Sequence, residues 1–196
     1  MASEGDAEGL VRLFVAVEIG AELRAALAAL QARLRPAASR VAWVPPQNLH
    51  VSLAFLGNVP RHMLELIVLA LDEAARPGAP FEFQVVGTGC FGSRAAPRVI
   101  WAGIADCPPL MALQARVAKG LRGLGLELDA RPFAPHLTLG RVRDPRGSER
   151  LTALLDADRG TVFGAARVEA LTLMRSRLLP SGAEYDTLHR ARLGSA

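Results

Sequence analysis

Two short segments, far apart in the chain, repeat one arrangement of residues. In the first, His50 is followed two positions later by Ser52, and in the second, His136 is followed two positions later by Thr138. Aliphatic residues fill the alternate positions of both segments, and this alternation predicts β-strands with one buried face. The histidine and the hydroxyl residue of each strand then share the other face. Two such strands predict a paired site.

The remaining apolar residues follow either strand or helix spacing. The expected helices cover 21–34, 62–75, 108–124 and 148–155, and the expected further strands cover 10–19, 41–44, 81–86, 99–104, 126–128, 167–176 and 185–193. We expect the first helix to pack on the first strand. Three glycines and a proline between Gly87 and Pro97 predict a loop. The last two strands predict a hairpin joined by the segment from Leu179 to Gly182.

Each half of the chain contains strands, helices and one histidine strand. This weak internal duplication predicts two similar α+β lobes without a flexible linker between them. We therefore expect one domain over residues 1–196, made of two interleaved lobes. A chain of 196 residues with 51% hydrophobic residues is long enough to bury a core of this kind.

The composition narrows the class of ligand and the compartment. A formal net charge of +4 and a pI of about 10.0 favour an anionic ligand such as RNA or phosphate, although no dense run of Lys or Arg is present. Cys90 and Cys107 lack metal-ligand spacing, and no signal-peptide pattern precedes them. No apolar run approaches the ~20 residues of a membrane-spanning helix. We expect a cytoplasmic protein that does not enter a membrane.

The paired histidines favour acid–base chemistry. An unperturbed imidazole titrates near pH 6.5, so one histidine can activate water while the other protonates a leaving oxygen. The hydroxyls of Ser52 and Thr138 can hold phosphoryl oxygens as charge builds up on them. A metal site is the natural rival, but neither histidine has a carboxylate or a cysteine at ligand spacing, so we predict no metal. The glycine-rich segment 87–92 lacks the lysine of a phosphate-binding P-loop.

These motifs resemble those of the two-histidine (2H) phosphoesterase superfamily, named for two His-x-Thr/Ser motifs. Within it the chain is most similar to the RNA 2′,3′-cyclic phosphodiesterases of the LigT-like group. The similarity spans nearly the whole chain and is carried by an opening strand at 12–17, the two motifs at 48–57 and 131–141, and a closing hairpin at 173–188. The chain departs from the commonest motif in having Ser52 in place of threonine, which keeps the hydroxyl.

The resemblance implies a bilobal fold, with antiparallel sheets facing a central cleft and helices outside. It also implies metal-independent hydrolysis of a terminal 2′,3′-cyclic phosphate of RNA or a nucleotide to a 2′-phosphate, without a cofactor. By analogy His50 is the proton donor, His136 is the proton acceptor, and Ser52 and Thr138 bind the phosphate. The two histidines are equivalent in pattern, so the residues themselves do not say which is acid and which is base. We expect a monomer.

Phe55 and Arg141 lie five residues after their histidines and, in the resemblance, hold the nucleobase by stacking and by cation contact. Strict alternation places both on the face opposite the histidines, which predicts a core residue and a surface charge. A bulge in each strand would reverse that placement. Both interpretations stay open from the sequence.

Other residues are assigned outside the site. His62 and His189 have no hydroxyl partner at the same spacing. The aromatic residues in or beside alternating strands are more commonly explained by core packing. These aromatic residues are Phe14, Trp43, Phe91, Trp101 and Tyr185. Two alternative functions remain: 2′–5′ RNA ligation at the same site, and a nucleotide- or RNA-binding module without turnover.

Overall fold

The computed structural model describes residues 9–38, 40–179 and 182–194. The helices are α1 (Ala21–Leu34), α2 (Leu64–Ala75), α3 (Pro108–Gly123) and α4 (Glu149–Ala157). The strands are β1 (Leu10–Glu18), β2 (Val41–Trp43), β3 (His50–Pro60), β4 (Phe81–Gly92), β5 (Pro97–Ile104), β6 (His136–Val142), β7 (Val162–Val168), β8 (Ala170–Leu179) and β9 (Gly182–Arg192). This composition of elements confirms the predicted α+β class.

The strands form one curved sheet in the order β7-β4-β5-β6-β3-β1-β8-β9, with β2 beside β6. Each of these pairings is antiparallel. The two histidine strands, β3 and β6, are neighbours in the middle of the sheet. The two sheets expected from the sequence are therefore the two halves of one sheet, and they meet at the histidine strands.

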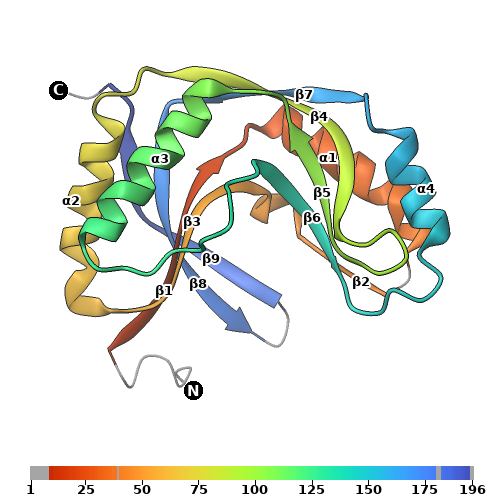
Figure 1. The fold of residues 1–196 in the computed structure, drawn as a ribbon, viewed down its shortest axis with the longest axis horizontal. Helices are drawn as coiled ribbons and strands as arrows, with labels where there is room; N and C mark the ends of the chain where they lie inside the picture. The colour runs from red at the N-terminus through yellow and green to blue at the C-terminus, as the bar shows by residue number, and fades with distance from the viewer. Residues whose placement is uncertain (1–8, 39, 180–181, 195–196) are drawn as a thin grey trace.

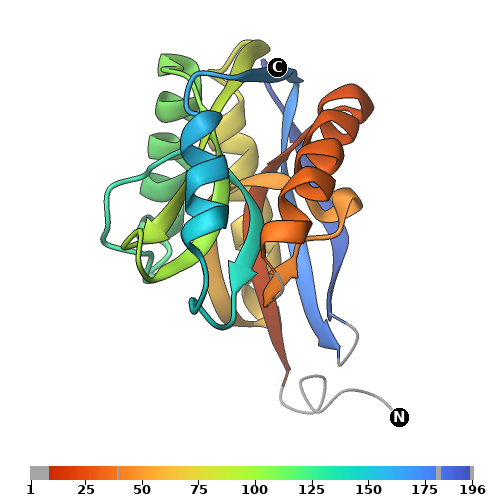
Figure 2. The ribbon, with the colours of Figure 1, turned by 90° about the vertical axis from the view of Figure 1, so that its right-hand side faces the viewer.

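The four helices lie at the two ends of the molecule (Figure 1). Helices α2 and α3 pack on each other and against β3, β8 and β9, whereas α1 packs against β7 and α4 against β4. Figure 2 views the molecule from the end that carries α1 and α4, which stand side by side in front of the strands. The expectation that α1 packs on β1 was wrong, because α2 and α3 cover that half of the sheet and α1 crosses to the other half.

Apolar residues at helix spacing fix the way in which α1 docks. Leu23, Leu27, Leu30 and Leu34 recur every three or four residues, and each is at most 3% exposed. They form one stripe along the helix, and burial of such a side chain stabilises the fold by about 1.5–3 kcal/mol. The stripe therefore explains why this segment forms a helix and which side of the helix packs on the sheet.

Several expected elements differ from the structure. The loop expected at 87–97 is mostly the end of β4, the strand expected at 126–128 is absent from the described residues, and the strand expected at 167–176 is divided between β7 and β8. The closing hairpin is confirmed, because Leu179 pairs with Gly182, while Pro180 and Ser181 of its expected turn lie outside the described residues. The glycines of β4 misled the prediction, since Gly87 and Gly92 have positive φ at register shifts within a strand rather than in a turn.

Candidate active site

The rings of His50 and His136 are held in the same way. The Nδ1–H group of His50 donates to the carbonyl of Asn48, and that of His136 donates to the carbonyl of Ala134, each at 2.7 Å. A carbonyl only accepts, so Nδ1 carries a proton in both rings. Nε2 is then left as the atom that can take up or release a proton. Both histidines present the same nitrogen for chemistry.

The two histidine strands are paired at Val51 and Leu137, both of which are 0% exposed. Because side chains alternate along a strand, the histidines and hydroxyl residues on either side of these two positions point to the opposite face. We call this the histidine face. The antiparallel register sets His50 level with Thr138 and Ser52 level with His136. The four side chains predicted to form the site thus lie on one face of two adjacent strands.

The two histidines have lowered pKa values. Burial of the ring is the largest cause in both cases, because a low dielectric disfavours the charged form, and the hydrogen bond from each ring to its backbone carbonyl partly opposes it. The charge of His136 further lowers the pKa of His50, and the charge of Arg141 further lowers the pKa of His136. Both rings are therefore biased toward the neutral form, and a bound phosphate anion would oppose that bias.

The hydroxyl groups are placed differently in the two motifs. Ser52 Oγ lies 3.0 Å from His50 Nε2, so the hydroxyl donates to the ring when His50 is neutral. Thr138 is half-buried on β6, on the same face as His136. Ser52 is thus in direct contact with its histidine, whereas Thr138 is brought to the same face without such a bond.

Phe55 and Arg141 both lie on the histidine face, because each strand contains a bulge. The ladder between β3 and β1 skips Leu53, and the ladder between β6 and β5 skips Leu139. Each bulge shifts the alternation by one position, so the residue three places after the hydroxyl returns to the histidine face. Phe55 is 57% exposed, and its ring centroid lies 6.1 Å from that of Phe14. Of the two interpretations left open for Phe55, this exposure excludes a core residue, and the proposed base contact stays a prediction.

Aromatic rings that the sequence assigned to the core surround His50. Phe14 stacks on the imidazole with ring centroids 4.9 Å apart, and Tyr185 meets both rings edge-on, at 5.6 Å from His50 and 4.9 Å from Phe14. Phe14 is 3% exposed, so it serves the core and the site together. The charges of Arg12 and Arg141 act on the Tyr185 hydroxyl and oppose the rise in its pKa that burial causes. Strand order explains the cluster, because β1 lies next to β3, and β8 and β9 follow β1 in the sheet.

A second aromatic pair stands beside His136. The Phe91 ring meets the imidazole edge-on at 4.9 Å, and Trp101 lies 5.8 Å from Phe91. Gly89 makes room for the indole, because a Cβ atom there would lie 2.4 Å from Trp101 Cζ2. Gly89, which the sequence predicts to lie in a loop, therefore lets an aromatic wall form next to the second histidine.

The other two histidines lie apart from this arrangement. His62 is exposed in the turn before α2. His189 Nε2 lies 2.7 Å from a carboxylate oxygen of Asp72 on α2. Neither has a contact with His50 or His136 in the described part of the chain, in line with their exclusion from the site.

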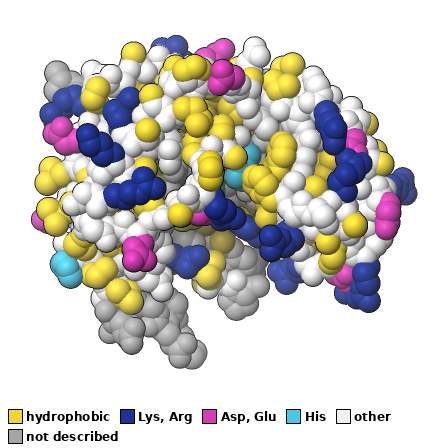
Figure 3. All heavy atoms as spheres, viewed as in Figure 1, with side chains coloured by type: hydrophobic (Ala, Val, Ile, Leu, Met, Phe, Trp, Pro, Cys, Tyr) yellow, Lys and Arg dark blue, Asp and Glu magenta, His cyan; other side chains and the backbone are white. Residues whose placement is uncertain are grey.

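Figure 3 shows the surface in the view of Figure 1. A histidine is visible near the middle, hydrophobic side chains lie beside it, and Lys and Arg side chains form a band that runs from there toward the lower right. Arg141 is exposed on the part of β6 that follows His136, and Arg143 is exposed directly after the strand. Positive charge next to two imidazoles favours an anionic ligand.

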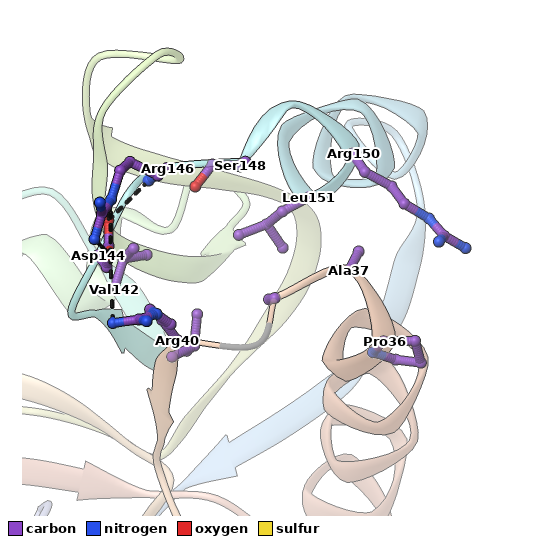
Figure 4. A pocket seen from close by; sticks show the side chains of 12 residues that line it. Pro36, Ala37, Arg40, Val142, Asp144, Arg146, Ser148, Arg150 and Leu151 are labelled. Atoms are coloured by element: carbon purple, nitrogen blue, oxygen red, sulfur yellow. Dashed lines mark hydrogen bonds and ion pairs between the residues drawn. The ribbon is translucent and has the colours of Figure 1, made fainter.

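A separate pocket of about 230 Å³ lies where the turn that follows α1 meets β2, β6 and α4, away from the histidines (Figure 4). Asp144 in its wall binds the guanidinium groups of Arg40 and Arg146, which lower the pKa of its carboxyl to about 2. Arg150 extends away from them in Figure 4. The charged groups of this wall are mostly engaged with one another.

Two kinds of feature are absent from residues 9–38, 40–179 and 182–194. No three His, Cys, Asp or Glu side chains in these ranges gather as a metal ion would require. No helix in them is long and apolar enough to cross a membrane.

Comparison with known proteins gives one consistent family. The model of the 2′-5′ RNA ligase superfamily matches residues 20–178. A protein of Methanothermobacter thermautotrophicus named RNA 2′,3′-cyclic phosphodiesterase is 33% identical over 183 residues, which cover 93% of this chain and 99% of that protein.

Two solved structures share the fold. The crystal structure of TT0787 of Thermus thermophilus has a TM-score of 0.80 and 33% identity and covers 93% of this chain and 98% of that one. The crystal structure of Escherichia coli LigT complexed with 3′-AMP has a TM-score of 0.76 and 27% identity and covers 95% and 99%. The paired motifs, the fold and these matches agree, and the chain belongs to the 2′-5′ RNA ligase superfamily of two-histidine phosphoesterases.

Proposed function

We propose that this protein hydrolyses 2′,3′-cyclic phosphate ends of RNA to 2′-phosphate ends, through acid–base catalysis by His50 and His136. The observation that carries the proposal is the matched orientation of the two rings. Each Nδ1–H is tied to a backbone carbonyl, and each Nε2 is directed to the same face of two paired strands. A proton donor and a proton acceptor are thereby available on one surface.

The proposed reaction requires only the two histidines and a water molecule. Water oxygen attacks phosphorus and passes a proton to Nε2 of His136, while the bond from phosphorus to the 3′ oxygen breaks. Protonated His50 gives its Nε2 proton to the departing 3′ oxygen, which becomes a hydroxyl. His136 ends protonated and His50 neutral, so exchange of protons with solvent restores the starting state.

Ser52 and Thr138 hold the phosphoryl oxygens in this proposal. The Ser52 hydroxyl, which donates to neutral His50 in the free protein, is released when Nε2 carries a proton, because that nitrogen then donates rather than accepts. The released hydroxyl can donate to a phosphoryl oxygen instead. Substrate binding and protonation of His50 therefore support each other.

Phe55 and Arg141 bind the nucleobase or its phosphate in this proposal. Phe55 is exposed on the histidine face beside Phe14, and Arg141 acts electrostatically on both His136 and Tyr185. A stacking ring and a cation on opposite strands suit an unstacked terminal base. The relatives described above support RNA cyclic phosphate ends and 3′-nucleotides as the ligand class, since one is named RNA 2′,3′-cyclic phosphodiesterase and another was crystallised with 3′-AMP.

The name of the matching family also favours a related reaction, 2′–5′ RNA ligation, as a second candidate. The same two histidines can serve this reaction, because the oxygen of a 5′ hydroxyl replaces water as the nucleophile that attacks phosphorus, gives its proton to His136, and the 3′ oxygen again departs with a proton from His50. The balance between ligation and hydrolysis is measured by incubating RNA halves with the protein and quantifying both products. Hydrolysis in excess supports the first proposal, and ligation in excess replaces it with the second.

The test of turnover uses a 2′,3′-cyclic nucleotide with EDTA present, followed by phosphorus NMR. We expect conversion to the 2′-phosphate, and His50→Ala and His136→Ala should each reduce kcat by at least about 10²-fold. Unchanged substrate at high protein concentration would leave a nucleotide- or RNA-binding module as the function. Loss of turnover only on adding the chelator would contradict a metal-independent reaction.

We further propose that the chain acts in the cytoplasm as a monomer and as one domain of two interleaved halves. Two unpaired cysteines, Cys90 and Cys107, fit a reducing compartment. The crossing of α1 to the β7 half supports interleaving. Light scattering after gel filtration tests the monomer, and a single unfolding transition seen by several probes tests the single domain.

A further inference from the structure

We propose that Gln31 and Gln114 are positioning residues that hold the bulges of the two histidine strands and so keep Arg141 and Phe55 on the histidine face. Each glutamine comes from a helix, and each binds the carbonyl of the residue that its strand ladder skips. The kinetic part of the inference rests on the proposed function, whereas the structural part does not.

Gln31 on α1 is bound at the bulge of β6. Its Nε2 donates to the carbonyl of Leu139 and to that of Val44, both at 2.8 Å. The amide of Val44 also donates to the Leu139 carbonyl at 3.0 Å. Gln31 is 1% exposed, and a buried glutamine that uses both amide hydrogens on main-chain carbonyls is fixed in one position.

Gln114 on α3 repeats this contact in the other half. Its Nε2 donates to the carbonyl of Leu53, the skipped residue of β3, at 3.3 Å. Leu53 and Leu139 each lie three residues after the histidine of their motif. Each glutamine belongs to a helix that packs on the opposite half of the sheet from the strand before it, as α1 follows β1 and α3 follows β5.

The bulges need such support because an extra residue breaks the ladder and leaves main-chain groups without strand partners. The burial of the strands shows the result, since two consecutive residues are buried in each: Leu53 with Ala54, and Leu139 with Gly140. Without the bulge, regular alternation would turn the following side chain to the opposite face. Each glutamine therefore helps to keep the side chain two residues after the skipped leucine, Arg141 or Phe55, on the histidine face.

Gln31→Met tests the inference with little change of volume. If the bulge at Leu139 relaxes, Arg141 turns away from His136, and the pKa of His136 should rise toward 6.5 while that of His50 moves less. Both are read from ring NMR signals during a pH titration without substrate. The KM for a 2′,3′-cyclic nucleotide should rise by about 10-fold or more with a smaller change in kcat, because a lost binding contact corresponds to about 1.4 kcal/mol per tenfold.

A double-mutant cycle separates positioning from general packing. In an Arg141→Ala background, Gln31→Met should change the pKa of His136 no further, because the charge that the bulge positions is already gone. Gln84→Met, the same exchange at an exposed position of β4, is the matched control and should leave both histidine titrations unchanged. An unaltered His136 titration in folded Gln31→Met, or a shift that persists without Arg141, would overturn the inference.

Gln114→Met is a second test of the positioning role, and it still applies if Gln31→Met does not fold. This variant should raise KM while leaving the pKa of His136 unchanged, and it should raise KM no further in a Phe55→Ala background. An equal increase in both backgrounds would contradict a role through Phe55. If the wild-type protein shows no turnover, the proposed function is wrong. The titration of His136 in Gln31→Met still decides the positioning role, because it is made without substrate.

Discussion

Val51 and Leu137 face each other across the antiparallel pair of β3 and β6, and each stands between the histidine and the hydroxyl residue of its motif. Both side chains are fully buried on the face away from the chemistry. This one contact sets the register that brings four site residues together. The geometry of the site therefore depends on core packing directly behind it.

Leu137→Ala should reduce both stability and activity. Removal of a fully buried leucine side chain costs about 2–5 kcal/mol, measurable as a fall in the free energy of unfolding in urea. Because Leu137 sets the register of both histidine strands, kcat/KM of the folded variant should also fall. Leu155→Ala on α4, where the leucine is 2% exposed, is the matched control: it should lose stability but keep its kcat/KM. Equal kinetics in the two variants would contradict the dependence on register.

Ser52→Ala and Ser52→Thr should behave differently. The alanine variant loses the hydroxyl that lies 3.0 Å from His50 Nε2, and we expect a fall in kcat of about 10²-fold, typical of a removed donor to a developing oxyanion. The threonine variant keeps the hydroxyl and should stay within a few fold of the wild type. Steady-state rates on a cyclic nucleotide compare them. If the alanine variant kept the rate of the threonine variant, Ser52 would have no part in phosphate binding.

Stability should fall in a defined pH window because of the two histidines. Well above pH 6.5 both are neutral in the folded and unfolded chain, so they add no pH dependence there. As the pH drops through 6.5, the unfolded chain binds protons first, since the pKa values of the folded state are lowered, and the free energy of unfolding decreases. Urea unfolding from pH 7.5 to 5 should show this decrease.

A control variant tests whether the histidines cause that decrease. His50→Asn combined with His136→Asn should flatten the dependence between pH 7 and 5, because the titrating rings are absent. A separate loss of stability at lower pH should remain, since the pKa values of Asp129 and Asp144 are lowered from 3.8 to about 2 in the folded state, so the unfolded chain binds protons first as the pH falls through this range. A decrease of the same size in the double variant would assign the window to other groups.

The sequence predicts the elements whose residues interact locally. The stripe of leucines on α1 and the alternation around His50 and His136 depend on neighbours along the chain, and both are confirmed in type and position. The packing of α1 on β7 was not predictable in this way, because it depends on which face α2 and α3 cover. Periodicity shows that a face is apolar, and it does not show which partner buries it.

The site was predictable to a similar degree. The paired motifs predict His50, Ser52, His136 and Thr138 on one face, and the structure brings them there. The faces of Phe55 and Arg141 depend on bulges held by side chains from distant helices, which alternation cannot reveal. A sequence signal exists in hindsight, since Ala54 and Gly140 are small residues at the same place in the two motifs. Gly140 has a structural reason, because a Cβ atom there would lie 2.6 Å from Val41.

Phe14→Leu should raise the pKa of His50. Burial is the largest cause of the lowered value, and Phe14 covers the imidazole at a centroid distance of 4.9 Å. A smaller, non-planar side chain admits water to the ring and relieves the penalty on its charged form, so the pKa moves toward 6.5. The alkaline limb of the rate profile should move to higher pH with it, because His50 is the proposed proton donor and must be protonated to act. Tyr185→Phe, which keeps an aromatic ring beside His50 and removes only a hydroxyl, should leave the ring NMR titration of His50 nearly unchanged. If Phe14→Leu titrated like the wild type, desolvation of His50 would have to come from the core beneath it, and Phe14 would serve packing alone.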